Sequence, residues 1–248
     1  INEVLAGYPP VNIFAYVTPQ MYGAVADGVT DDTQAIQDAI DAADKMGVFF
    51  PAGDYLVTSL TLSDSTVLMG DTGANIIQGS SALVIDATGL KNVKIIGLTF
   101  TNSNSTPRIM TLTTCNDCLI ESCHFIGNDI NQYTADYIVE LNQCTNTLIL
   151  DCEAERAEAE GLTLLDCVDC TVRGGVYHTM DDGSGVITGG QNTRNVIIEG
   201  VETYACSGSA INVNSPYTTV KYCYCHDNTS IGINLGHGTP NSAATYIA

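Results

Sequence analysis

The sequence contains no tryptophan and few basic residues. Its 248 residues include only eight lysines and arginines against 28 aspartates and glutamates, so the formal net charge is −20. A chain with so few cations is poorly suited to bind nucleic-acid phosphates or an anionic membrane surface, because both require clustered Lys and Arg. An acidic surface suits neutral partners or cations instead. We therefore expect no nucleic-acid partner.

Long apolar runs and helical patterns are also scarce. No run approaches the roughly 20 apolar residues that are needed to cross a bilayer, so we expect no membrane insertion. Only the segment 33–47 spaces its apolar residues, such as Ile36 and Ile40, along one face of a helix. The absence of helical patterns between later segments argues against a βαβ protein.

The chain instead carries a repeat of about 25 residues. Six nine-residue segments with alternating apolar positions begin at residues 92, 117, 146, 169, 195 and 217. A second group of shorter segments begins with GLTL at 161, GVIT at 185, SAIN at 209 and IGIN at 231. Short strands at this spacing predict a solenoid of parallel sheets, with the helix at 33–47 covering its first coil.

Most of the ten cysteines fall into columns of this repeat. The columns are Cys115, Cys144 and Cys167; Cys118 and Cys170; and Cys123, Cys152 and Cys223. Other coils place Val, Leu, Thr or Gly at these inward positions, so we expect a ladder of free thiols that fills the core. Disulfides between stacked neighbours, or zinc at the two CxxC pairs, are the alternatives. Abundant buried thiols favour assembly in a reducing compartment or an anaerobic source.

The entry to the repeat carries a family resemblance. MYGAVADGVTDDTQAIQDAI at 21–40, followed by VFFPAGDYLVTSLTL at 48–62, resembles the entry segment of pectate-lyase-like β-helices, closest in character to bacteriophage tailspikes and polysaccharide depolymerases. The resemblance implies an all-β, right-handed, single-stranded parallel β-helix with an N-terminal capping helix at about 33–46. It implies a lead-in at 1–17 and a β-helix domain at 18–248, with coils from about 48. The fold alone does not fix the reaction.

Three aspartates precede the predicted helix. Asp27, Asp31 and Asp32 are suited to capping the helix and forming the turn before it. A calcium site formed by these carboxylates is the alternative. Apart from calcium, we expect no cofactor and no bound metal.

Chemistry in such a solenoid must lie on outward positions, because inward residues fill the core. One outward column contains His124, Glu153, Glu202 and Tyr224, and another contains Glu155, His178, Tyr204 and His226. Adjacent members are roughly 5 Å apart, so Glu155 should stack beside His178. No other outward columns combine carboxylate, imidazole and phenol so densely, although a merely solvated acidic face is the alternative.

Neighbouring loops add further carboxylates to this face. The catalytic candidates are Glu155, Asp181, Asp182 and His178, and the substrate-binding candidates are Glu153, Arg156, Glu202, Tyr204, Tyr224 and His226. A glycosidase needs two carboxyl groups, ~5–5.5 Å apart for retention or ~6.5–9.5 Å apart for inversion. A lyase would need a base, with Arg156 or Arg173 to neutralise a uronate.

Together, these features predict a phage tail protein that binds and cleaves a bacterial surface polysaccharide, by hydrolysis or elimination. The family resemblance implies a homotrimer in the virion tail, assembled in the host cytoplasm. A non-catalytic receptor-binding or structural module, with Tyr217, Tyr222 and Tyr224 as a sugar-binding face, is one alternative. A secreted, extracellular pectate lyase or epimerase is another. The final residues show no clear cap, so we expect further chain or a partner beyond the last coil.

Overall fold

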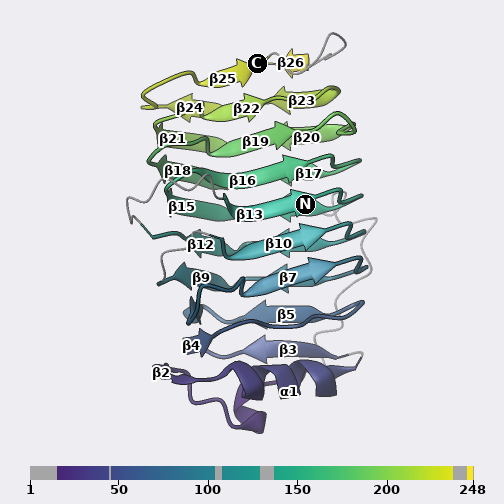
Figure 1. Cartoon of the computed structure of the whole chain (residues 1–248), viewed down its shortest axis with the longest axis vertical. Coiled ribbons are helices and arrows are strands. Elements are labelled where there is room, and N and C mark those ends of the chain that lie inside the picture. Colours follow the sequence, from purple (N-terminus) through teal and green to yellow (C-terminus); the bar gives the residue numbers. More distant parts are fainter. Residues whose placement is uncertain (1–15, 45, 104–107, 129–136, 237–244, 248) are drawn as a thin grey trace.

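The computed structural model describes residues 16–44, 46–103, 108–128, 137–236 and 245–247, which wind into a parallel β-helix (Figure 1). Sheet A contains β1 (Tyr16–Val17), β3 (Gly47–Phe50), β5 (Val67–Gly70), β8 (Lys94–Ile96), β11 (Leu119–Glu121), β14 (Leu148–Leu150), β17 (Thr171–Arg173), β20 (Val196–Glu199), β23 (Thr218–Lys221) and β26 (Thr245–Ile247). Sheet B contains β2 (Asp27–Asp31), β4 (Gly53–Val57), β6 (Ala74–Gln78), β9 (Thr99–Asn102), β12 (His124–Ile126), β15 (Glu153–Ala157), β18 (Val176–Met180), β21 (Glu202–Cys206) and β24 (Tyr224–His226). Sheet C contains β7 (Ile85–Thr88), β10 (Met110–Thr113), β13 (Tyr137–Asn142), β16 (Glu160–Leu165), β19 (Val186–Gly189), β22 (Ile211–Val213) and β25 (Ile233–Leu235).

The predicted all-β, right-handed parallel β-helix is therefore confirmed. Each full coil contributes one strand to each sheet, and stacked strands pair in parallel, as in β8–β11 and β12–β15. The six nine-residue segments lie in the predicted mutual register. The predicted alignment of the second group is wrong by one residue in its last two segments. Gly161 and Gly185 align with Ala210 and Gly232, the second residues of SAIN and IGIN and not the first.

Each nine-residue segment is bent rather than straight. A residue with left-handed backbone φ separates its sheet A strand from its sheet B strand: Gly97, Ser122, Asp151, Gly174, Gly200 and Tyr222. Glycine adopts this conformation without strain, and Asp tolerates it better than most residues. The first half of each segment therefore faces a different side of the molecule from the second half.

The interior confirms the predicted thiol ladder. Cys115, Cys144 and Cys167 occupy one stacked position, because the residues that follow them pair as neighbouring bridges. All ten cysteines are free, and eight of them are buried. The Cys144 thiol, for example, donates to the carbonyl of Leu112 on the preceding coil at 3.2 Å.

The helix α1 (Thr33–Ala43) covers the first coil, next to β3, as the entry motif predicted (Figure 1). Ile36, Ala39, Ile40 and Ala43 form its buried face. The helix ends at Ala43, earlier than predicted, because Asp44 has a left-handed φ of 49°. The short 3₁₀ helix η1 (Pro19–Tyr22) packs against α1. No helix in the described ranges is long and apolar enough to cross a membrane.

The entry aspartates act on nearby backbone groups. The buried Asp32 carboxylate accepts hydrogen bonds from the amides of Val25 at 2.7 Å and Ala26 at 2.9 Å. Asp31 accepts from the Thr33 amide at 3.0 Å, and Asp27 accepts from the Thr30 amide at 2.7 Å. The contacts of Asp27 and Asp31 fit turn formation at the start of α1. The side chain of Asp32, at the N-cap position, binds the segment that follows η1 and does not cap the helix.

Candidate functional site

The outer face of sheet B brings the predicted outward columns together. Strand register places Glu155 beside His178, His178 beside Tyr204, and Tyr204 beside His226. Glu153 and Glu202 lie in the other column, two coils apart with Val176 between them. The parallel pairing of β12, β15, β18, β21 and β24 thus creates one polar surface from five separate parts of the sequence.

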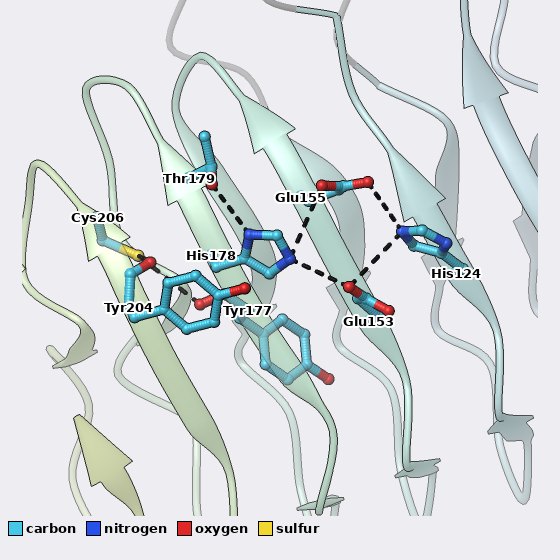
Figure 2. Close-up of polar contacts among 8 residues, drawn as sticks. All are labelled: His124, Glu153, Glu155, Tyr177, His178, Thr179, Tyr204 and Cys206. Atoms are coloured by element: carbon cyan, nitrogen blue, oxygen red, sulfur yellow. Dashed lines mark hydrogen bonds and ion pairs between the residues drawn. The ribbon is translucent and has the colours of Figure 1, made fainter. Parts of the chain in front are cut away.

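Two carboxylates and two imidazoles form a compact group, which we call the sheet B cluster: His124, Glu153, Glu155 and His178 (Figure 2). His178 Nε2 lies 3.1 Å from Glu153 Oε1 and 3.8 Å from Glu155 Oε2. His124 Nε2 lies 3.2 Å from Glu155 Oε1 and 3.9 Å from Glu153 Oε1. Both carboxylates therefore lie between the same two imidazoles, an arrangement suited to holding and moving a proton.

The outward positions also hold a continuous stack of rings, formed by His178, Tyr204, His226 and Tyr224. The His178 and Tyr204 rings are 4.5 Å apart between centroids with an interplanar angle of 7°. His226 lies 5.2 Å from Tyr204 and 4.5 Å from Tyr224. Because these rings cover one another's faces along the stack, their polar edges are the parts available to a ligand.

Local charge and burial shift the pKa values of two rings in this stack, Tyr204 and His226. Burial, followed by the charges of Glu153, Glu202 and Glu155, raises the pKa of the Tyr204 phenol. Hydrogen bonds to Asp227 and Glu202 raise the pKa of His226. Tyr204 is therefore a neutral proton donor at physiological pH, and His226 retains its proton to higher pH than a free imidazole.

Asp181 and Asp182 lie apart from the sheet B cluster, at the corner that follows β18. Their amides donate to the carbonyls of Ala157 at 2.9 Å and Glu158 at 2.7 Å. Both side chains are exposed, and within the described ranges neither forms a hydrogen bond or ion pair with the cluster. Burial raises the pKa of Glu160, and the negative charge of Asp182 raises it further. The expected grouping of these aspartates with Glu155 is thus not observed.

The two arginines considered for uronate binding lie on different sheets. Arg156 follows Glu155 in β15, where it is exposed and has a left-handed φ of 61°. Arg173 lies on sheet A, where its Nη2 is 3.0 Å from Glu199 Oε2. Lys221 reaches the other oxygen of Glu199 at 3.2 Å. Arg173 therefore belongs to a separate charge ladder, contrary to the expectation that it lies near the candidate site.

His124 is a member of the cluster that was not among the sequence candidates. The column alignment contained it, one coil before Glu153, and that position was the available signal.

Among the described residues, no group of three or more His, Cys, Asp and Glu side chains has a geometry suited to a metal ion.

Comparison with known proteins agrees with the fold. The chain is 27% identical over 229 residues to the pre-neck appendage protein of Bacillus phage B103, an alignment that covers 90% of this chain and 24% of that protein. It therefore spans about a quarter of the length of that relative.

Solved structures show the same fold at lower sequence identity. The A-module of mannuronan C-5 epimerase AlgE6 from Azotobacter vinelandii matches with a TM-score of 0.74 at 20% identity, covering 88% of this chain and 72% of that chain. The Dettilon tailspike protein matches with a TM-score of 0.68 at 16% identity, covering 92% and 48%. The family model described as rhamnogalacturonase A/epimerase, pectate lyase-like matches residues 17–245. The chain therefore belongs to the rhamnogalacturonase A/epimerase, pectate-lyase-like family.

Proposed function

We propose that this chain is the β-helix part of a phage tail appendage that binds a bacterial surface polysaccharide and cleaves it on the outer face of sheet B. Similarity to the phage B103 appendage protein supports the location in a virion. The observation that carries the catalytic proposal is the pair of carboxylates, Glu153 and Glu155, shared between His124 and His178. Trimer formation and calcium binding are not needed for this proposal.

The cluster supplies the groups that acid–base cleavage requires. Glu155, in its protonated form, donates a proton to the glycosidic oxygen as the bond to the leaving sugar breaks. The water that attacks the anomeric carbon gives its proton to Glu153, and His178, which contacts both carboxylates, returns that proton to Glu155. The Tyr204 phenol is a neutral hydrogen-bond donor beside them. Asp181 and Asp182 remain candidate acid or base residues at the neighbouring corner, where the charge of Asp182 acts on Glu160.

Charge favours hydrolysis over elimination from a uronate. Within the described strands of sheet B, Arg156 is the sole Lys or Arg. Glu153, Glu155 and Glu202 all lie on its outer face and would repel an anionic sugar. We therefore expect neutral or amino sugars at this surface, with new reducing ends as the product.

The test measures reducing-end release and unsaturated-product absorbance on isolated bacterial surface polysaccharides. The Glu155→Gln and His178→Gln variants should lose most turnover, by 10²-fold or more if they act in proton transfer. Asp86→Asn, an exposed carboxylate on sheet C, is the matched control and should retain full turnover. Unchanged turnover in both sheet B variants would remove the site assignment.

A non-catalytic binding role is the second candidate, because one coil exposes three tyrosines. Tyr217 and Tyr222 lie at left-handed corners on either side of β23, and Tyr224 begins β24. Exposed phenol rings offer an apolar surface with a polar tip, which suits sugar binding. Glycan binding without turnover, abolished by Tyr222→Ala and Tyr224→Ala, would favour this role.

A further inference from the structure

A glutamate–histidine pair occurs twice on sheet B with the same geometry. In the first pair His178 Nε2 lies 3.1 Å from Glu153 Oε1, and in the second His226 Nε2 lies 3.0 Å from Glu202 Oε1. In both pairs the glutamate is one coil before the histidine, on the same two outward columns. The second pair therefore repeats the first after a translation of two coils.

The positioning of both histidines is also repeated. His178 Nδ1 contacts the side chain of the next residue, Thr179, at 2.9 Å, and His226 Nδ1 contacts Asp227 at 2.8 Å. Thr179 and Asp227 both have left-handed φ values, of 57° and 50°. Each imidazole is thus held at one nitrogen by the corner residue and presents the other nitrogen to its glutamate.

Exposure shows which group of each pair a ligand can reach. The Glu153 and Glu202 side chains are both 43% exposed, whereas the imidazoles beneath them are 9% and 27% exposed. The imidazole in each pair contacts Oε1 of its glutamate. Oε2 of the same carboxylate is available to accept a hydrogen bond from a ligand hydroxyl. The repeated unit is therefore an oriented acceptor supported by a largely covered imidazole.

We propose that Glu153 and Glu202 are two equivalent subsites for a linear β-1,4-linked, uncharged glycan that runs along the coils. This inference rests on the proposed function and adds the linkage and repeat of its substrate. Two coils span roughly 10 Å at the spacing of adjacent strands. Alternate sugars of an extended β-1,4-linked chain are turned over, so the same hydroxyl group faces one side once per disaccharide, at a similar spacing.

The two subsites differ in one respect that assigns them different roles. Glu155 and His124 complete the cluster around Glu153, whereas Glu202 is approached by His226 and lies beside Tyr224, the exposed end of the ring stack. The first subsite therefore adjoins the chemistry, and the second holds the glycan in register. Tyr204 lies on the same strand as Glu202, with its ring between those of His178 and His226, so its hydroxyl can contact the sugar at the second subsite.

The experiment measures binding of chito-oligosaccharides of two to six sugars by titration calorimetry, with malto-oligosaccharides as the α-linked comparison. Affinity for the β-linked series should rise in a step once the oligomer reaches both carboxylates, at three to four sugars. Glu153→Gln and Glu202→Gln should each weaken the longer oligomers about tenfold or more and weaken the disaccharide less than about twofold. Asp86→Asn should change neither.

The outcomes separate this inference from the proposed function. Tighter binding of the α-linked series, no dependence on length, or an effect of only one glutamate variant would overturn the two-subsite proposal. If no chito-oligosaccharide binds while bacterial surface polysaccharide is still cleaved, the inference fails and the proposed function stands. Circular dichroism of each variant checks that the coils remain folded.

Discussion

The ring of Tyr204 lies parallel to the ring of His178, with centroids 4.5 Å apart and an interplanar angle of 7° (Figure 2). Such a stack stabilises by about 0.5–1.5 kcal/mol beyond the burial of its area. Tyr204→Ala should therefore lower the free energy of unfolding by about that amount or more. Tyr204→Phe keeps the stack and should restore the stability, which denaturant unfolding will measure. Loss of glycan binding in Tyr204→Phe would then report the hydroxyl alone.

Gly175 shows how closely adjacent coils approach at a corner. Its φ is 84°, and an added Cβ would overlap the carbonyl of Cys152 on the preceding coil. Gly175→Ala should destabilise the fold by more than about 3 kcal/mol, because backbone of a packed coil would have to move. Gly89→Ala is the matched control, since its φ of 72° is similar but nothing lies within 4 Å. Gly89→Ala should lower the free energy of unfolding by only about 1–2 kcal/mol, the cost of a left-handed backbone for a residue with a Cβ. Equal losses of stability in both variants would contradict the explanation by close packing.

The thiol ladder predicts a specific pattern of chemical reactivity. Eight cysteines are buried, so a disulfide reagent should not reach their thiols in the native protein. For Cys206, burial also raises the pKa to about 11, which lowers its reactivity further. Cys223 and Cys225 are half-buried and should react first, although slowly because burial also raises the pKa of each. All ten should react in denaturant without reductant. A smaller number under those conditions would indicate disulfides.

Glu160 should make stability depend on pH. Burial is the main cause that raises its pKa, and Asp182 adds to it. The folded state therefore favours the protonated carboxyl, so stability is lost as the pH rises from the unfolded-state pKa through the folded-state value. Glu160→Gln should have a higher melting temperature than the wild type at pH 7, and the difference should vanish in acid. Glu158→Gln is the control, because it also removes one negative charge from this acidic protein. An equal rise in melting temperature in Glu158→Gln would exclude burial of Glu160 as the cause.

The inward columns were predictable because stacked coils impose a strict period on the sequence. Cys115, Cys144 and Cys167 share a position with residues of similar size, and the structure stacks them as the alignment predicted. The outward neighbours Glu155 and His178 followed from the same register. Alternation along a strand carries this information, because a shift by one residue would expose every buried side chain.

The corners were harder to predict, because left-handed φ occurs at residues that do not favour it. Ser122 and Tyr222 take this conformation where other coils have Gly or Asp. The bend therefore did not show in the sequence. Arg173 ends a strand of sheet A, before the corner, whereas the candidate site lies on sheet B, which the same segment enters only after the corner. Asp181 lies in a connection between sheets, where no period fixes its position.

The most direct test of the account is the structure of the protein soaked with oligosaccharides from a polysaccharide that it binds. We predict that the sugar will lie along the outer face of sheet B, across β12 to β24, with hydroxyl groups on Glu153 and Glu202. Sugar bound on sheet A or sheet C, with the outer face of sheet B empty, would contradict the account.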